Sequence, residues 1–495
     1  MKRGKFLCVL TVIVLLLSLL CSCQSEEKKE EFYHSRSARA PLTDVLRISL
    51  GEYRFVSFLK RGLIEVASGE GDDERFGVMD GAGRIVIPAE YGSFSMTGDF
   101  LLATGDSSGY LYNVFNKEGK LVYHTNKYID IDDVGGGCVR ILEEGDALLY
   151  DDEGKNLLAA TSLDKSFDYS VCEDYVIAKN SRTVLLLDAR TGAILRTFSS
   201  ASSAVTYDDV AYVGKGELIL LRNERVSSEK DCTVVKDGNY LKQTILKYSI
   251  GKASTRTLSL DRHIVSIGTP YSFGNTQEDR ENYPLASGCF AVAYYETENK
   301  VAVGTSHYIG DANLSVVKTL PESANPLLSM IDNVAALCAP SGKIYLVNDK
   351  TEVLATIDDA VYQDVRFSGS VLTASKVVDG IRRSGGFDLD GRQVIPFEYT
   401  YISEFIGGKA IAVKQEKVYL IDAAGTERYL SEARILYYWV GFYETSADGK
   451  IGLASFDGEE LLPTSFDGVR AVSFYGDEVF IALSKGESDE IYRLF

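Results

Sequence analysis

The chain has 495 residues, and its 71 acidic and 52 basic side chains give a formal net charge of -19 at pH 7. A protein of this acidity repels nucleic acid and anionic lipid headgroups, so we expect neither as a partner. Its eight cysteines are scattered without a CxxC pair and its four histidines are isolated, which indicates neither a zinc site nor a disulfide scaffold. We therefore predict no metal and no cofactor.

The first residues have the order of a secretory signal. The basic residues Lys2, Arg3 and Lys5 precede an unbroken apolar run over residues 6–20. This run is shorter than the roughly 20 residues that a membrane-spanning helix needs. We therefore expect residues 1–22 to be a signal peptide that is removed from the mature protein.

A cysteine follows the apolar run at a characteristic spacing. Leu20 lies three positions before Cys23, with Cys21 and Ser22 between them. This arrangement resembles the lipobox of bacterial lipoproteins. The resemblance implies that Cys23 is lipidated and becomes the mature first residue, so that the protein is extracytoplasmic and anchored to the cell membrane or outer membrane. An ordinary signal peptide that is cut nearby is the alternative.

The segment after Cys23 predicts a tether. Residues 23–45 carry charges of both signs, few apolar side chains and no periodicity, which is typical of a disordered spacer. The folded part, residues 46–495, is then held away from the lipid.

Two segments of the folded part repeat each other, residues 76–103 and residues 386–413. Each has a short strand that ends in Asp, a turn with Gly, a strand that ends in Val-Ile-Pro, and a Tyr three residues after the Pro. The matched residues are Asp80, Gly83, Pro88 and Tyr91 in the first copy and Asp390 (or Asp388), Gly391, Pro396 and Tyr399 in the second. A third, weaker copy runs over residues 451–466.

This pattern resembles the bacterial WG repeat. The signature Trp of that repeat is missing, because the only Trp of the chain is Trp439, and Phe76, Gly385 and Lys450 or their neighbours stand in its place. The resemblance implies that the matched residues have a structural role in each repeat and that they are not catalytic.

Elsewhere, short β-prone runs alternate with turns rich in Asp, Asn and Gly, which is the pattern of successive hairpins. Such units cannot bury a face alone and must stack. We predict an all-β, repeat-built β-propeller, because closure into a ring hides the edge strands. An open β-solenoid or two smaller β domains are the alternatives. The polar segments 223–243 and 271–285 are interpreted as long loops, and residues 325–337 suit a helix or a strand.

No arrangement of residues indicates a catalytic or metal site. The acidic clusters lie where hairpin turns need Asp, and no twelve-residue calcium loop closes around them. These clusters are Asp130, Asp132 and Asp133; Asp151, Asp152 and Glu153; and Asp388 and Asp390.

The sequence therefore favours a monomeric, non-catalytic binding or scaffolding module that is attached to the membrane through its lipid and binds a protein or glycan of the cell envelope. The alternative is a carbohydrate-active hydrolase whose paired carboxylates come from different repeats.

Anchoring through Cys23 is directly testable. We expect a Cys23→Ala variant to leave the membrane fraction, because the lipid has no attachment point. Fractionation of cells followed by immunoblotting measures this, and retention of the variant at the wild-type level would contradict the lipid anchor.

Overall fold

The computed structural model describes residues 39–105, 109–159, 166–232, 234–236, 239–258, 263–268, 289–298, 301–311, 317–319, 330–432 and 437–495. The predicted signal peptide, Cys23, most of the tether and segment 271–285 lie outside these residues. The described part consists of β-strands and two short 3-10 turns, η1 (Gly71–Asp73) and η2 (Glu229–Asp231). It contains no helix long and apolar enough to cross a membrane.

The described strands form eleven antiparallel sheets, which follow one another in chain order. The first three are β2 (Arg54–Phe58), β3 (Ile64–Ser68), β4 (Arg75–Met79) and β5 (Ile85–Tyr91); β6 (Ser93–Thr97), β7 (Phe100–Thr104), β8 (Tyr112–Asn116) and β9 (Leu121–Thr125); and β10 (Ile129–Gly135), β11 (Cys138–Glu143) and β12 (Asp146–Asp151).

The next three sheets are β13 (Asp168–Cys172), β14 (Tyr175–Lys179), β15 (Thr183–Asp188) and β16 (Ile194–Ser199); β17 (Val205–Gly214), β18 (Glu217–Arg225), β19 (Val234–Lys236), β20 (Asn239–Ser249) and β21 (Ser254–Leu258); and β22 (His263–Gly268), β23 (Cys289–Glu298), β24 (Val301–Asp311) and β25 (Val317–Thr319).

Four more follow: β26 (Met330–Ile331), β27 (Val334–Cys338), β28 (Ile344–Val347) and β29 (Val353–Ile357); β30 (Gln363–Ser368), β31 (Val371–Val378), β32 (Ile381–Phe387) and β33 (Gln393–Tyr399); β34 (Tyr401–Ile402), β35 (Lys409–Lys414), β36 (Lys417–Asp422) and β37 (Glu427–Glu432); and β38 (Phe442–Ala447), β39 (Lys450–Ser455) and β40 (Glu460–Phe466). The last sheet combines β41 (Gly468–Tyr475), β42 (Glu478–Lys485) and β43 (Ser488–Leu494) with β1 (Val45–Ile48).

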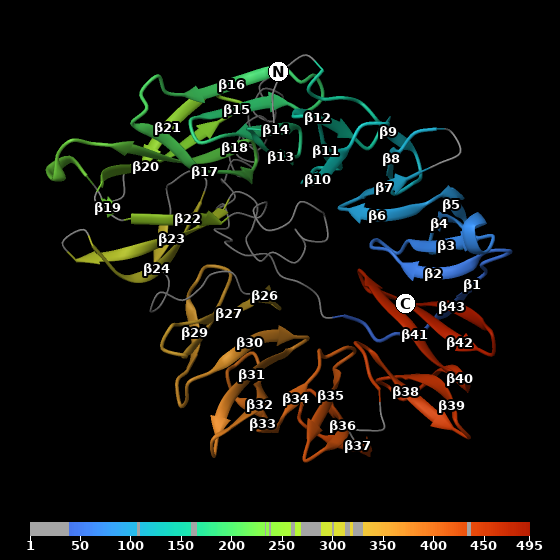
Figure 1. Cartoon of the computed structure of the whole chain (residues 1–495). Coiled ribbons are helices and arrows are strands. Elements are labelled where there is room, and N and C mark those ends of the chain that lie inside the picture. The colour runs from blue at the N-terminus through green and yellow to red at the C-terminus, as the bar shows by residue number, and fades with distance from the viewer. Residues whose placement is uncertain are drawn as a thin grey trace, which may run out of the picture.

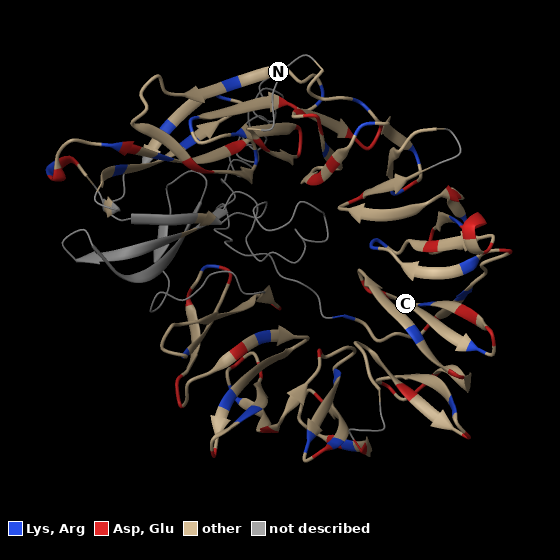
Figure 2. Cartoon of the chain, viewed as in Figure 1, with Lys and Arg blue, Asp and Glu red and all other residues tan. Residues whose placement is uncertain are grey.

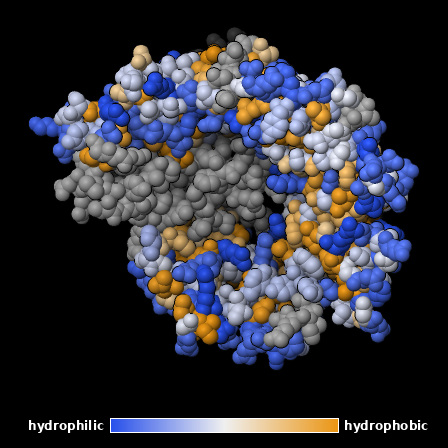
Figure 3. Space-filling view, viewed as in Figure 1, coloured by the Kyte–Doolittle hydropathy of each residue, from blue (hydrophilic) through white to orange (hydrophobic). Residues whose placement is uncertain are grey.

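The sheets are arranged in a ring around a common centre (Figure 1). The first strand of a sheet, such as β6, β30 or β41, lies toward the centre, and the last strand, such as β9 or β37, lies toward the outside. On the face shown in Figure 3, hydrophilic residues cover much of the outer rim of the ring, and apolar residues appear in patches among them. The fold is thus the all-β propeller that the repeats predict.

The ring is closed by pairing between the two ends of the fold. Strand β1 pairs antiparallel with β43 and becomes the outermost strand of the last sheet. Next to it, the backbone N–H of Asp44 donates to the carbonyl of Phe495 at 2.9 Å, and the N–H of Phe495 donates to the carbonyl of Asp44 at 3.1 Å. Because this pairing joins the first strand to the last, an open solenoid does not describe the fold.

The core lies between successive sheets, so the central strands are buried on both faces. Strand β15 shows this arrangement. Leu185 lies in one apolar cluster with Leu149 of β12, whereas its neighbour Leu186 lies in another cluster with Leu220 of β18. A strand covered on both sides needs a continuous apolar run, which explains why these strands do not alternate between polar and apolar residues.

The structure corrects two boundaries. Residues 39–44, which the sequence assigns to the tether, pack on the ring: the carbonyl of Arg39 accepts the N–H of Gly407 at 3.0 Å, and Leu42 is buried in one cluster with Phe442. Segment 223–243 is not simply a loop, since it extends the β18–β20 hairpin and adds β19 to its sheet. Leu42 in the first segment and Cys232 in the second are buried by the fold.

The closing strand yields a stability test. Ile48 is 3% exposed and packs in one cluster with Phe55 and Phe480, whereas Leu46 of the same strand is 43% exposed. We expect Ile48→Ala to lower the free energy of unfolding by about 2–4 kcal/mol, through lost burial and a cavity. The matched Leu46→Ala change should cost less than about 0.5 kcal/mol. Urea denaturation measures both, and equal losses would show that β1 is not packed as described.

Candidate functional site

The repeat signature forms the turn between the third and fourth strands of a sheet. In the first copy, the carboxylate of Asp80 accepts the backbone N–H groups of Ala82 and Arg84, each at 2.9 Å. Gly83 has φ +82° and its N–H donates to the carbonyl of Asp80 at 3.0 Å. Asp and Gly therefore act together, because the carboxylate fixes the turn and only Gly takes this φ without strain.

The structure decides which of two aspartates in the second copy matches Asp80. Asp388, rather than Asp390, occupies the position of Asp80, since its carboxylate accepts the N–H groups of Asp390 at 3.0 Å and of Arg392 at 2.8 Å. The N–H of Gly391 donates to the carbonyl of Asp388 at 3.1 Å. Asp390 instead forms an exposed ion pair with Arg392 at 2.9 Å. Sequence spacing alone left both residues as candidates, and the backbone register decides between them.

The Pro and Tyr of the signature lie on the fourth strand. Pro88 in β5 and Pro396 in β33 lie on the outermost strands of their sheets. An outermost strand has a neighbour on one side only, so the N–H that proline lacks is not needed to pair with a further strand. Tyr91 is 9% exposed and Tyr399 is fully buried. The hydroxyl of Tyr399 donates to Glu427 of the next sheet. Burial and this carboxylate raise the pKa of Tyr399. The signature residues thus position neighbouring sheets.

The turn glycines also allow successive sheets to come close together. The turn at Gly425 lies over the preceding sheet, and a Cβ added there would be 2.6 Å from the carbonyl oxygen of Val394. At Gly119 an added Cβ would overlap the carbonyl of Val86. Both glycines have positive φ values, +81° and +83°. The repeated Gly therefore serves the contact between sheets as well as the turn.

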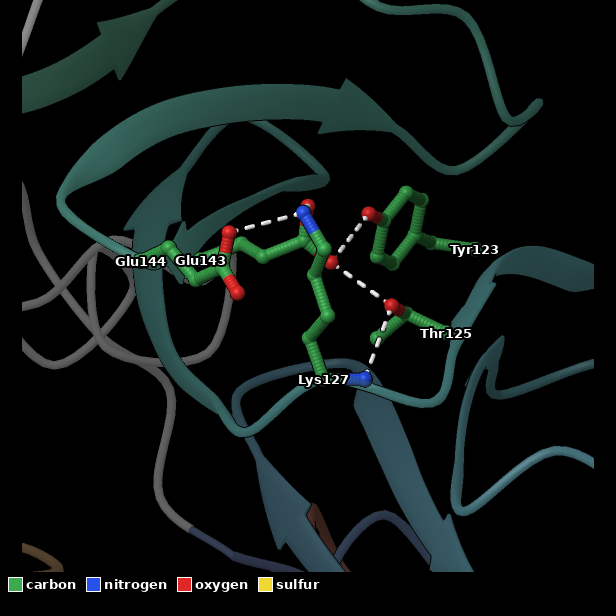
Figure 4. Close-up of polar contacts among 5 residues, drawn as sticks. All are labelled: Tyr123, Thr125, Lys127, Glu143 and Glu144. Carbon is green, nitrogen blue, oxygen red and sulfur yellow. Dashed lines mark hydrogen bonds and ion pairs between the residues drawn. The ribbon is translucent and has the colours of Figure 1, made fainter.

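A polar contact joins the second and third sheets (Figure 4). Glu143 accepts hydrogen bonds from the Tyr123 hydroxyl at 2.9 Å and from the Thr125 hydroxyl at 2.7 Å, and the Lys127 ammonium lies between Glu143 and Glu144. Burial and Glu143 raise the pKa of Tyr123 to about 12. Burial of Glu143 would raise its own pKa, but the two hydroxyls and Lys127 outweigh this and hold it below 4.5.

The acidic clusters are used by the fold. Asp132 pairs with Arg140 at 2.5 Å, the carboxylate of Asp133 accepts the N–H of Gly135 at 3.0 Å, and Asp151 accepts the N–H of Lys155 at 2.8 Å. Acidic residues lie at many turns around the ring (Figure 2). The described residues include no group of three His, Cys, Asp or Glu that could hold a metal.

The described cysteines with placed side chains form no disulfide bond with one another. Cys138, Cys172 and Cys232 are buried, and Cys338 is partly buried. Burial, together with nearby carboxylates, raises the pKa of Cys138 to about 12. A thiol that stays protonated at neutral pH is a poor nucleophile, so Cys138 acts as a small apolar core residue.

A cavity of about 310 Å³ opens between the β30–β33 sheet and the start of the next sheet. Two of its lining residues, Thr373 and Ser375, are buried, with 4% and 2% of their surface exposed. Its lining residues, most of them polar, are Asp364, Arg366, Thr373, Ala374, Ser375, Arg382, Ser384, Thr400, Tyr401 and Ile402. We call this cavity the arginine pocket.

One arginine of the pocket is held by a local network. The Nε of Arg382 donates to the Ser375 hydroxyl at 2.9 Å, and its guanidinium pairs with Asp364. The Ser375 hydroxyl in turn donates to Asp364 at 2.9 Å. Asp364 lies in a β-bulge with φ +49°, a conformation that costs an L-residue energy and that clusters at functional sites.

The other arginine has no acidic partner. The guanidinium of Arg366 donates to the carbonyl of Ile402 at 3.0 Å, across to the next sheet. Among the described residues, no carboxylate lies within ion-pair distance of Arg366. The charged lining residues are Arg366, Arg382 and Asp364, so two positive charges and one negative charge give the lining a formal charge of +1. The pocket is therefore cationic although the chain as a whole is strongly acidic.

Sequence reasoning missed this pocket entirely. A usable signal was present in β31, VLTASKVV, where Thr373 and Ser375 alternate with apolar residues in a strand that is otherwise core-like. Buried hydroxyls need hydrogen-bond partners, so two of them on the same face of a strand indicate that this face packs against polar groups and not against an apolar sheet. The arginines themselves could not be selected, because exposed Arg residues occur throughout the chain.

Comparison with known proteins supports the repeat directly. Residues 387–419, which run from the end of β32 into β36, match the family model for the WG containing repeat. The chain contains a WG repeat. No curated protein matches the sequence significantly.

Several solved structures are similar in fold. A eukaryotic initiation factor is 11% identical, with 81% of this chain and 91% of that chain covered and a TM-score of 0.38. BamB from Moraxella catarrhalis is 9% identical, with 92% and 97% covered and a TM-score of 0.27. The beta-propeller domain of Cps50 (Swd1) from Myceliophteria thermophila is 10% identical, with 66% and 94% covered and a TM-score of 0.24. At these scores the similarities carry no argument about function.

The contact in Figure 4 predicts a pH effect. We expect Glu143→Gln to lower the free energy of unfolding by about 1–2 kcal/mol at pH 7, since the hydrogen bonds from Tyr123 and Thr125 lose their charged acceptor. The pKa of Glu143 is lowered in the fold, so this stabilisation is complete above pH 4.5 and is lost as the pH falls through the lowered pKa.

The matched control is Glu144→Gln, whose carboxylate pairs only with Lys127 and is 64% exposed. It should change stability by less than about 0.5 kcal/mol. Denaturation curves between pH 3 and pH 7 compare the two variants. A Glu143→Gln deficit that persists unchanged below the lowered pKa would contradict the assignment.

Proposed function

We propose that this protein is an extracytoplasmic lipoprotein, anchored to the bacterial membrane through Cys23, that acts as a non-catalytic binding module for a protein or glycan of the envelope. The single observation that carries the proposal is the arginine pocket, an open cavity of about 310 Å³ whose lining includes two arginines and several hydroxyls. This volume lies at the lower end of the range of small-ligand sites.

The position of the tether supports this proposal. Residue 39, where the described chain begins, lies beside the turns 403–408 and 476–477: Gly407 donates to Arg39, and Arg39 pairs with Asp477 at 3.3 Å. These turns join the first and second strands of their sheets. We call the side of the ring that carries them the tether face.

The arginine pocket opens toward the other side. Arg382 is the second residue of β32, close to the turn 379–380 between the second and third strands, and Thr400 follows the end of the fourth strand. Antiparallel strands reverse direction at each turn, so these positions lie at the opposite ends of the strands from the tether face. A protein held by its N-terminus would thus present the pocket away from the lipid.

A hydrolase on this scaffold would need two carboxylates at one site, about 5 to 10 Å apart. Among the described residues that line the arginine pocket, Asp364 is the one carboxylate, and it is already paired with Arg382. No observation therefore favours the hydrolase over the binding module.

Blocking the pocket tests the proposed function. We expect full-length wild-type protein to retain an envelope glycan or protein, and Thr400→Trp, at the exposed mouth of the pocket, to lose at least about tenfold in affinity through steric exclusion. Glycan arrays and biolayer interferometry with envelope components measure this.

The matched control is Thr426→Trp, an exposed turn residue of the neighbouring sheet that does not line the pocket. It should bind like wild type. Equal binding by both variants would place recognition elsewhere, and release of new reducing ends from a bound glycan would show that the protein is an enzyme.

A further inference from the structure

We infer that the arginine pocket binds the carboxylate of an acidic sugar, a residue of the hexuronate class. This inference rests on the proposed function, because it names the partner that the binding module would hold. Three properties of the pocket lead to it: one uncompensated guanidinium, a wall of hydroxyls, and an exposed aromatic ring at its mouth.

The charge of the pocket fits a single negative charge. Asp364 neutralises Arg382, which leaves Arg366 as the cation that a ligand can meet. A guanidinium presents its N–H groups in a planar fork that matches the two oxygens of a carboxylate. A phosphate monoester carries more charge than one free guanidinium compensates, so a carboxylate is the better match.

The hydroxyls of the pocket fit a polyol. The Ser384 side chain lines the pocket, and the Thr400 hydroxyl donates to the carbonyl of Val413 at 3.0 Å, which leaves its oxygen free to accept. Small-ligand sites are usually lined mainly by apolar side chains. This pocket instead combines arginine and hydroxyl groups with Ala374, Tyr401 and Ile402, a mixture that suits a sugar, which has both hydroxyls and apolar ring faces.

The aromatic ring fits the flat face of a pyranose. Tyr401 lines the pocket and is 42% exposed, and the centre of its ring lies 5.7 Å from that of Tyr438, which packs against it. Exposed, supported rings combine an apolar face with a polar tip. A C-terminal peptide carboxylate would also meet Arg366, but its last side chain needs an apolar recess, and Ala374 and Ile402 supply little of one.

The experiment uses the full-length protein and three small probes in isothermal titration calorimetry: D-glucuronate, D-glucose and N-acetylglycine. We expect D-glucuronate to bind, and D-glucose and N-acetylglycine to bind at least about tenfold more weakly, since one lacks the carboxylate and the other lacks the sugar ring. Binding of D-glucuronate should weaken as salt increases, because one ion pair forms.

The variants assign the effect to one side chain. Arg366→Gln should weaken D-glucuronate at least about tenfold, and Arg366→Lys should lie between this variant and wild type, because it keeps the charge but loses the planar fork. Arg392→Gln is the matched control, since Arg392 lies on an exposed turn of the same sheet and pairs with Asp390 outside the pocket. Circular dichroism melting checks that each variant is folded. If Arg366→Gln does not fold, Arg366→Lys still tests the role of the guanidinium.

The outcomes are distinct. Recognition of a carboxylate by Arg366 is contradicted if D-glucuronate and D-glucose bind with equal affinity. It is also contradicted if a folded Arg366→Gln or Arg366→Lys variant binds D-glucuronate with wild-type affinity. If N-acetylglycine binds as tightly as D-glucuronate, the pocket does not recognise the sugar ring, and a peptide C-terminus becomes the indicated ligand. If none of the probes binds while Thr400→Trp still abolishes retention of an envelope partner, the acidic-sugar inference fails and the proposed binding function stands.

Discussion

The fold depends on close packing between successive sheets, to which several turn glycines contribute. Gly119 and Gly425 lie so near the carbonyls of Val86 and Val394 that a side chain would separate the sheets. Because both faces of a sheet pack in this way, strands such as β15 become continuous apolar runs. The contact between a turn glycine and the preceding sheet therefore links the choice of turn residues to the spacing between sheets and to the burial of their central strands.

Ring closure follows from the same requirement. A stack of two-faced sheets leaves an uncovered face at each end, and this protein covers both by pairing β1 with β43 and packing Ile48 against Phe55 and Phe480. The N-terminal segment is thereby fixed to the tether face. If Cys23 carries a lipid, the closing strand also sets which side of the ring faces the membrane.

The arginine pocket forms where the repeat becomes irregular. A bulge at Asp364 and the short strand β34 replace the regular packing between two sheets, and Thr373 and Ser375 face the space that results. Polar side chains are tolerated there because they are bonded to one another and to the backbone. A cavity with polar groups can thus form in the repeat array beside the apolar clusters of the two sheets.

The sequence by itself determined the hairpins, the repeat signature and the all-β propeller, because turn residues such as Gly83 and Gly391 act locally. Only the tertiary structure decided that Asp388 rather than Asp390 matches Asp80, since a one-residue choice of register depends on the partner strand. It also decided the pocket, whose charge depends on Asp364 pairing with Arg382 while Arg366 reaches the neighbouring sheet. Such partners are fixed by packing between strands, and residue spacing does not encode them.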